Sequence, residues 1–428
     1  MSEPAETTES RTLPGGSDRR WTAIDTNWTL SLFGTAVGAG ILFLPMNAGA
    51  GGLWTLIVVT ALVLPMTYLS HRALSRFVCA SRHPDSDITV VAREYFGDTA
   101  GKIVGVLYFL SIYPIVLIYG VGITNAIDST IVNQLGMPSP PRWLLSGVLI
   151  ALLTAVMVAG ERVTMLVTQI IVWPLAFIVM GVSLLLIPEW DLEGQTAVQP
   201  PLEMGATVWL TIPVLVFAFS HAAAISQFSV ALQRDYGPAL APRKASKILL
   251  VVAVALVVFT MTFVFSCTFA LGQDGLRAAS ASNLPVLSYL ANVMQSPLIS
   301  FAGPAIAIAA ITSSYFGHYM GASEGARSIA RMFLGDARVD AVSPRAQDWL
   351  VATFIFTTTW IVAILNPSIL DLIDRLSGPV IASILYLMPM YAIHKVPALE
   401  PYRGRWSNVF VTIAGLVAVT GIFFGFLN

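Results

Sequence analysis

A long stretch without any charged or histidine side chain constrains this chain most strongly. It runs from Trp28 to Ser70 and is long enough for two membrane crossings of roughly 20 residues each. Only 11% of the 428 residues are charged and 56% are hydrophobic, whereas a soluble domain carries about 25% charged residues. The composition therefore predicts an all-α integral membrane protein with several transmembrane helices.

Hydropathy predicts eleven spans, joined mostly by short connections. They cover approximately residues 28–49, 53–74, 103–127, 143–160, 163–187, 207–230, 247–272, 297–323, 349–365, 379–394 and 407–427. With the N-terminus in the cytosol, all but Arg142, Arg277 and Arg375 of the 23 lysines and arginines lie on the cytosolic side, as the positive-inside rule requires. We therefore expect a cytoplasmic N-terminus and an extracytoplasmic C-terminus. Residues 28–428 should form one transmembrane domain after a disordered cytoplasmic tail over residues 1–27.

The centre of the first span is poor in residues that hold a helix. Residues 34–40 read Gly-Thr-Ala-Val-Gly-Ala-Gly, and Pro45 follows shortly after. Glycine destabilises a helix, and unwound backbone is tolerated at membrane depth only where protein or a polar cavity surrounds it. One interpretation is a discontinuous helix whose break lines a binding site. The other is a close contact between helices through small residues.

The sixth and eighth spans also contain polar residues in their centres. The sixth contains Pro213 and then Ser220-His221, and a histidine inside a membrane is costly unless it faces a cavity or a partner. Interrupted first and sixth spans are what two five-helix repeats of inverted topology would produce. The eighth contains Thr312-Ser313-Ser314, whose hydroxyl groups either line a polar site or bond to carbonyls of their own helix.

Three motifs, taken together, resemble those of a known family. They are Gly34-Thr-Ala-Val-Gly-Ala-Gly-Ile-Leu-Phe-Leu-Pro45 in the first span, Phe217-Ala-Phe-Ser-His221, Ile225-Ser-Gln-Phe228 and Gln233-Arg-Asp-Tyr-Gly237 around the sixth, and Phe316-Gly-His-Tyr-Met-Gly-Ala322 with Glu324-Gly325 in the eighth. In these motifs the chain resembles the hydroxy and aromatic amino acid permeases, particularly the bacterial serine/threonine transporter branch, of the amino acid–polyamine–organocation superfamily. The resemblance implies a leucine-transporter-like 5+5 inverted repeat plus one extra helix, with helices 1 and 6 discontinuous, in the bacterial inner membrane.

The resemblance and the residues together predict a secondary active transporter. It would be an ion-coupled symporter that imports a small neutral amino acid by alternating access, and L-serine or L-threonine is the favoured substrate. Unwound backbone would offer N–H groups to the substrate carboxylate and carbonyl groups to its ammonium. The expected substrate-binding residues are Thr35, Ala36, Val37, Gly38, Ala39, Gly40, Phe219, Ser220, His221, Ala222 and Tyr113.

The coupling ion stays open between Na⁺ and H⁺, and no other cofactor is expected. Matching to sodium-coupled members of the fold implies a cation site made by Gly34, Val37, Ala309, Thr312 and Ser313. Serine permeases of this family usually place Lys-Ser where this chain has Ser313-Ser314, and the missing ammonium favours sodium. Bacterial members are generally proton-coupled, however, and His221 and His318 are the candidate proton-linked residues.

Two other functions are compatible with parts of the sequence. An aromatic amino acid permease is an alternative, because Ala222, Ala223 and Ala224 leave room for a larger side chain, and a membrane sensor that binds an amino acid without moving it is another. An enzyme is not expected, since the acidic residues of Glu161-Arg162 and Asp371–Asp374 are interpreted as solvated ends of helices. The expected partners are the amino acid and the lipid bilayer. No basic tract points to nucleic acid, and the sequence does not specify an oligomeric state.

Overall fold

The structure, a computed structural model, describes residues 20–82, 88–159, 174–294 and 296–424. Within these ranges the regular structure is entirely helical. The coarse prediction of an all-α membrane protein is confirmed, because seven helical stretches among the described residues are long and apolar enough to cross a bilayer. Three shorter apolar helices accompany them, at Arg142–Val158, Pro174–Glu189 and Trp406–Gly421. The first part of the fifth predicted span, residues 163–173, lies outside the described residues.

The first half of the chain contains two long helices and several shorter ones. In order these are α1 (Ala23–Ala36), η1 (Ala39–Leu42), α2 (Leu44–Ala48), η2 (Gly49–Gly51), α3 (Gly52–Cys79), α4 (Ile88–Phe96), α5 (Asp98–Ser129), η3 (Thr130–Gln134), α6 (Arg142–Val158) and η4 (Ile187–Glu189). The helix of the fifth span is described from residue 174 onward. Proline lies inside both long helices, at Pro65 in α3 and Pro114 in α5.

The second half begins with a second pair of short helices that meet end to end. In order the helices are α8 (Pro201–Ala218), α9 (Ala222–Tyr236), α10 (Ala241–Ala281), α11 (Val286–Val293), α12 (Pro297–Leu334), α13 (Asp336–Asp340), α14 (Pro344–Leu365), α15 (Ile369–Leu372), η5 (Ile373–Ser377), α16 (Gly378–Ala382), η6 (Ser383–Leu387), α17 (Met388–Lys395), η7 (Pro397–Tyr402) and α18 (Trp406–Phe424). From α15 to α17 the chain forms one nearly continuous span in which η5 and η6 are π-helical segments.

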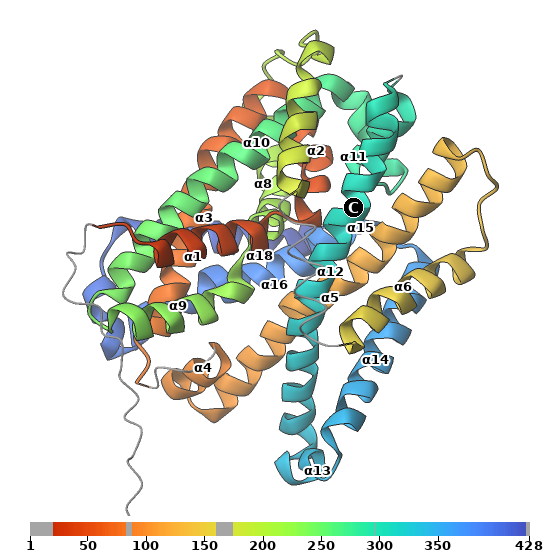
Figure 1. Ribbon diagram of the computed structural model, residues 1–428. Coiled ribbons are helices and arrows are strands. Elements are labelled where there is room, and N and C mark those ends of the chain that lie inside the picture. The colour runs from red at the N-terminus through yellow and green to blue at the C-terminus, as the bar shows by residue number, and fades with distance from the viewer. Residues whose placement is uncertain (1–19, 83–87, 160–173, 295, 425–428) are drawn as a thin grey trace, which may run out of the picture.

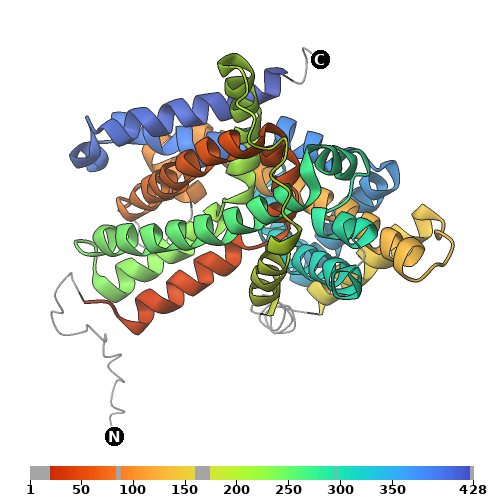
Figure 2. The ribbon, with the colours of Figure 1, turned by 90° about the horizontal axis from the view of Figure 1, so that it is seen from above.

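The helices pack in two groups with the short helices between them. In Figure 1, α5, α6, α12 and α14 form one group, and α12 packs along the length of α5. Helices α1, α3, α9 and α10 form the other, and Figure 2 shows α1, α9 and α10 on the same side of the molecule. Helices α8, α16 and α18 pack against one another, and α2 packs on α8. Gly40 of η1, shortly after α1 ends, lies against Ala218 at the end of α8, so the two helix ends are close together in the interior.

Helix α1 starts earlier than the sequence analysis expected. It begins at Ala23, inside the range 1–27 that was expected to be a disordered tail, while residues 1–19 lie outside the described residues. A capping box explains the start: Thr22 accepts a hydrogen bond from the N–H of Asp25, whose carboxylate accepts one from the N–H of Thr22. An acidic residue in the first turn also suits the positive end of the helix dipole.

Three described helices were not anticipated from hydropathy. Helices α4, α11 and α13 are each nine residues or shorter, and a window that searches for spans of about 20 apolar residues passes over helices of this length. Helix α4 packs on α5, and α11 packs on α12. They extend the connections between spans and leave the interior breaks in the same place.

Candidate binding site

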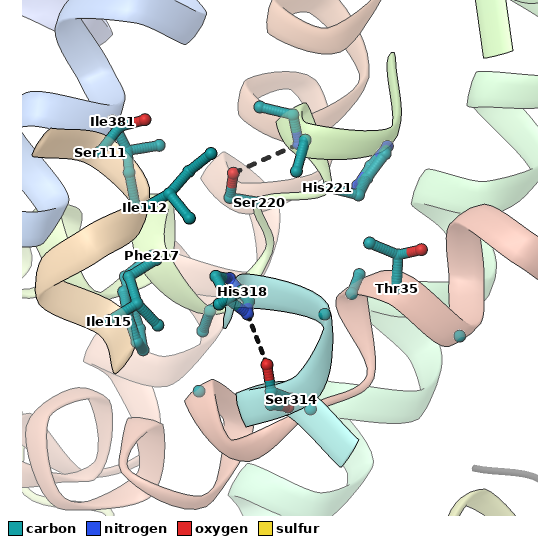
Figure 3. Close-up of a pocket in the computed structure, with 18 of the residues that line it drawn as sticks. Thr35, Ser111, Ile112, Ile115, Phe217, Ser220, His221, Ser314, His318 and Ile381 are labelled. Atoms are coloured by element: carbon teal, nitrogen blue, oxygen red, sulfur yellow. Dashed lines mark hydrogen bonds between the residues drawn. The ribbon is translucent and has the colours of Figure 1, made fainter. Parts of the chain in front are cut away.

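A cavity of about 470 Å³ lies between the break that follows α1 and the break between α8 and α9. Its walls come from α1, α5, the junction of α8 with α9, α12 and the span that contains α16 and η6. Figure 3 shows Thr35, Ser220, His221, Ser314 and His318 around it. The polar side chains in its lining are Asn27, Ser31, Thr35, Tyr108, Ser111, Tyr119, Ser220, His221, Ser313, Ser314 and His318. The described lining contains no Asp, Glu, Lys or Arg.

The first break follows α1 and is built from small residues. Helix α1 ends with the N–H of Val37 bonded to the Phe33 carbonyl at 2.9 Å, and Gly38 is then fully extended. The N–H of Ala39 donates to Ser314 Oγ at 2.9 Å. A Cβ atom on Gly38 would lie 2.1 Å from that same oxygen, so only glycine lets α12 approach this closely. The N–H groups of Gly38 and Gly40 make no hydrogen bond within the described residues.

The second break, between α8 and α9, is held by a histidine from another helix. Residues 219–221 leave the helical conformation, and the N–H of His221 donates to His71 Nε2 at 3.1 Å. Since Nε2 of His71 accepts, its Nδ1 carries the proton and donates to the Thr67 carbonyl at 2.7 Å. The two imidazole rings stack with their centroids 3.6 Å apart. His71 on α3 thus supports the break with both of its ring nitrogens satisfied.

His71 is a residue that the sequence analysis missed. It is 1% exposed and follows directly after the uncharged stretch that ends at Ser70. A histidine at the edge of an apolar helix was the available signal, because such a side chain must find buried partners. Also missed were the cavity-lining residues Ser111, Ile112, Ile115, Ile381 and Ile384.

Helix α12 forms the wall opposite the second break. His318 Nδ1 lies 2.8 Å from the Ser314 carbonyl, to which it donates, and the edge of the His318 ring meets Tyr119 with centroids 5.4 Å apart. Ser313 Oγ is 3.4 Å from the Ala310 carbonyl. Both Ser313 and Ser314 line the cavity, so at least two of the three consecutive hydroxyl groups face the site.

The predicted substrate-binding residues divide into two sets. Lining the cavity are Thr35, Ala36, Gly38, Gly40, Ser220, His221 and Ala222. Val37, Ala39 and Phe219 are buried and do not line it. Tyr113 lies elsewhere, with its ring stacked between Phe109 and Phe354, while Tyr108 and Tyr119 of the same helix reach the cavity.

The residues expected to bind a cation or a proton are divided in the same way. Gly34 and Ser313 line the cavity, whereas Val37, Ala309 and Thr312 do not. Both candidate proton-linked histidines, His221 and His318, line it. His221 Nε2 is covered by protein and has no hydrogen-bond partner within the described residues.

Along the first span, the cavity is accessible from one end and closed at the other. Asn27, Leu30, Ser31 and Thr35 are exposed on the cavity side of α1. Residues 36–46, which begin at the break and continue into α2, are all buried. Solvent therefore reaches the break along α1, and the protein is closed beyond it.

The arrangement suits a small molecule that carries both a positive and a negative charge. The free N–H groups of Gly38 and Gly40 can bind an anionic group, and the last carbonyl groups of α1 have lost their helical donors and can bind a cationic one. Neutral hydroxyl and imidazole groups complete the lining. A pocket of several hundred Å³ with a few convergent polar groups is typical of small-molecule sites.

Comparisons with known proteins place this chain in a family. Two relatives match nearly end to end: the serine transporter SdaC of Escherichia coli, with 44% identity over 99% of this chain and 100% of its own, and the threonine/serine transporter TdcC of Escherichia fergusonii, with 39% identity over 94% and 95%.

Solved structures with a similar fold include MhsT in complex with L-phenylalanine (TM-score 0.58, 13% identity, 96% of this chain and 99% of that one) and a mutant of the Eremococcus coleocola manganese transporter (TM-score 0.66, 14% identity, 97% and 89%). Both have the leucine-transporter-like fold, so the coarse expectation of a fold of this type is confirmed, while the eleven spans and the 5+5 inverted repeat stay predictions. The sequence matches the tryptophan/tyrosine permease family over residues 28–396, and the chain belongs to that family.

Proposed function

We propose that this protein is an ion-coupled importer of L-serine or L-threonine that works by alternating access. The observation that carries the proposal is the uncharged polar cavity between two helix breaks, open along α1 and closed beyond Ala36. The relatives that match over their whole length are named as a serine transporter and a threonine/serine transporter, which supports the same substrate class. Transport, rather than catalysis, is the activity of such proteins.

In this proposal the main chain of the first break binds the charged groups of the amino acid. The N–H groups of Gly38 and Gly40 receive the carboxylate, and the carbonyl groups at the end of α1 receive the ammonium. The side-chain hydroxyl of the substrate then needs a polar partner, and Ser220, which lines the cavity, is placed to supply it. A site built to bind that hydroxyl discriminates strongly against alanine, because its own polar group would otherwise remain unpaired.

The membrane topology completes the proposal. Eleven spans, with a 5+5 inverted repeat and one extra helix, would pair the broken span of α1, η1 and α2 with the broken span of α8 and α9. The distribution of lysine and arginine favours an N-terminus in the cytosol and a C-terminus outside, and the similarity to bacterial transporters favours a bacterial inner membrane. Because the cavity opens along α1, this conformation would face the cytosol.

The coupling ion in this proposal is Na⁺ or H⁺. For sodium, the hydroxyl of Ser313 and the main chain of Gly34 border the cavity and supply oxygen ligands. For protons, His221 and His318 border it, and histidine titrates near neutral pH in water. Uptake into proteoliposomes at fixed pH, with sodium replaced by choline, separates the two: undiminished accumulation excludes sodium coupling.

The substrate is tested by thermal shift on the purified protein. L-serine or L-threonine should raise the melting temperature, because a ligand that binds only the folded state stabilises it by mass action. L-alanine is the matched control without the hydroxyl and should produce a much smaller shift. A panel in which neither hydroxy amino acid shifts the melting temperature would remove the proposed substrate class.

An aromatic substrate is the second candidate, and two observations favour it. The family description names tryptophan and tyrosine, and Ala222 and Ala223 leave small side chains in the cavity wall. Competition of L-tryptophan and L-tyrosine against radiolabelled L-serine uptake decides between the substrates. A sensor would bind one of these amino acids in the thermal-shift panel and carry none of it across the proteoliposome membrane.

A further inference from the structure

Asp374 is an acidic residue inside a membrane helix, and none of the functions above uses it. It lies in the π-helical segment η5, within the apolar span Ile369–Lys395. Its place in Asp371–Asp374, at the end of a predicted span, was interpreted as a solvated helix end. That interpretation was wrong for this residue, because Asp374 is only partly exposed and its Oδ1 is completely covered by protein.

The carboxyl group of Asp374 has few partners for a buried acid. Oδ2 accepts one hydrogen bond, from Asn47 Nδ2 at 3.1 Å, and Oδ1 has no hydrogen-bond partner within the described residues. The hydroxyl of Ser377, one turn further along η5, is buried and likewise has no partner in that part of the chain. A covered carboxylate oxygen without a donor is costly, and binding a proton removes the charge, which accounts for most of that cost.

Neighbouring charges do not compensate Asp374. The charged groups that act on it are Asp371 and Arg375, which are both more than half exposed and lie 3.7 Å from each other. Helices α2, α16 and α18 carry no titratable side chain, and α8 carries only Glu203 in its exposed first turn. Helix α5, which also packs on η5, carries Asp98, Lys102, Tyr108, Tyr113, Tyr119 and Asp128.

Asp374 lies beyond the first break, on the side of the cavity that is closed. Its partner Asn47 belongs to α2, in the closed part of the first span beyond the break. One turn later, Gly378 packs so tightly on α8 that a Cβ there would lie 2.6 Å from the Pro213 carbonyl. The segment that contains Asp374 and Gly378 therefore contacts the second half of one broken span through Asn47 and the first half of the other through Pro213, on the side of the cavity that is closed here.

We propose that Asp374 is a proton-binding site of the transport cycle. The inference rests on the proposed function and specifies its coupling ion. In the closed arrangement the carboxyl group holds a proton on Oδ1 while Oδ2 accepts from Asn47. When the side beyond the break opens, water reaches the carboxyl group and it binds a proton from that compartment. After that side closes, the proton leaves to the cytosol through the cavity that is open along α1, so the cycle carries a proton in the same direction as the amino acid. Protonation of an uncompensated acid thus accompanies closure of one side of the membrane.

The test measures exchange and proton movement separately, in proteoliposomes that contain the full chain. Exchange of internal L-serine for radiolabelled external L-serine, with no ion gradient, reports substrate transport alone. A pH-sensitive dye inside the vesicles reports proton entry when L-serine is added outside. The variants are Asp374→Asn, and Asp371→Asn as a matched control that removes an exposed carboxylate from the preceding turn.

We expect the native protein and Asp371→Asn to carry out both reactions. Asp374→Asn should lose serine-driven proton entry by tenfold or more, whereas its serine exchange falls far less. Undiminished proton entry in Asp374→Asn overturns the inference, and so does a native protein that exchanges serine but moves no protons with it. If the native protein exchanges no serine at all, the proposed function fails instead.

A second pair of measurements covers the case in which Asp374→Asn does not fold, as judged by gel filtration. Asp374→Glu keeps a carboxyl group and should retain proton entry with a shifted pH profile. On the native protein, dicyclohexylcarbodiimide, which modifies protonated carboxyl groups in apolar surroundings, should label Asp374 in preference to Asp371. Labelling should fall as the pH is raised, and equal or absent labelling of Asp374 would contradict a protonated acid.

Discussion

The two helix breaks at the cavity are built on opposite principles. The break after α1 depends on the absence of side chains, since a Cβ on Gly38 would overlap Ser314 Oγ and one on Gly40 would be in tight contact with the Phe217 ring. The break between α8 and α9 depends on the presence of one, because His71 accepts the hydrogen bond of the His221 N–H. The glycine break leaves main-chain groups free for a ligand, whereas the histidine break satisfies its main chain internally. We therefore expect the break after α1 to bind the substrate and the break between α8 and α9 to hold His221 in position.

The two broken spans are also tied together away from the cavity. Asp25 in the first turn of α1 accepts from Lys244 Nζ at 2.7 Å and from the Tyr236 hydroxyl at 2.9 Å, at the end of α9. Asp25 and Lys244 are both almost fully buried. The hydrogen bond from Tyr236 holds the first half of one broken span against the second half of the other, and the ion pair joins α1 to the start of α10.

Loss of this ion pair should have the largest effect on stability. Lys244→Met leaves Asp25 buried without its cation, and breaking a buried pair on one side costs about 3–5 kcal/mol. The double variant Asp25→Leu with Lys244→Met removes both charges and should recover most of that loss. Melting temperatures in detergent measure both. A single variant that melts like the native protein would show that the tie contributes little.

The same pair predicts how stability depends on pH. Burial works to raise the pKa of Asp25, but the hydrogen bonds from Lys244, the Thr22 N–H and Tyr236 outweigh it and the pKa is lowered. The stabilisation is therefore complete above the unfolded-state pKa of about 3.9 and is lost as the pH falls through the lower folded-state pKa. Native protein should lose melting temperature below about pH 4, and Asp25→Leu with Lys244→Met should lose less. Parallel pH profiles of the two would contradict this.

Gly38→Ala tests the glycine break and should be the next largest change. The backbone there is extended and suits alanine, so the effect comes from the new Cβ, 2.1 Å from Ser314 Oγ. Overpacking of this kind costs about 1–3 kcal/mol, and serine uptake should be abolished because the site itself is displaced. Adding Ser314→Ala leaves 3.4 Å to the remaining Cβ, so the double variant should fold better than Gly38→Ala alone. Equal stability of the two would place the strain elsewhere.

His71→Ala tests the histidine break. It leaves the buried N–H of His221 without an acceptor, at a cost of about 1–3 kcal/mol, and the stacked ring is lost as well. Serine should still bind, with lower affinity, because His71 positions His221 and does not line the cavity. Thermal shift with and without L-serine measures both effects. His71→Gln, whose amide oxygen can accept, is the control and should restore part of the stability.

The two breaks differ in how much of each could be predicted from the sequence. Glycines at Gly34, Gly38 and Gly40 are a local signal, and the helix ends at Ala36 within that run. The location of the second interruption was suggested by Ser220-His221, and α8 ends at Ala218. The group that supports this interruption could not be read from the local pattern, since His71 is 150 residues away in the chain and its role is set by packing.

The remaining differences have the same physical origin. Tyr108, Tyr113 and Tyr119 are all on α5, and only the rotation of α5 against α12 decides which of them reach the cavity. Asp374 lies close to the end of its hydropathic span, where composition indicates solvent. The packing of α8 against η5 and α16 covers it instead. Local composition predicts where a helix breaks, and tertiary packing decides what the break and its neighbours contact.

Ser314→Ala should have the smallest effect, and it compares two adjacent hydroxyl groups. Ser314 Oγ accepts from the Ala39 N–H at 2.9 Å, and its loss leaves that buried N–H without an acceptor at a cost of about 1–3 kcal/mol, but no stacked ring is lost as it is in His71→Ala. Ser313→Ala should cost less, since Ser313 Oγ is 3.4 Å from its nearest acceptor, the Ala310 carbonyl. If the coupling ion is sodium and Ser313 binds it, however, Ser313→Ala will weaken the sodium dependence of serine uptake while Ser314→Ala leaves it in place. Equal sodium dependence in both variants would assign Ser313 to packing, whereas serine uptake that is independent of sodium in the native protein and in both variants would leave the coupling to a proton.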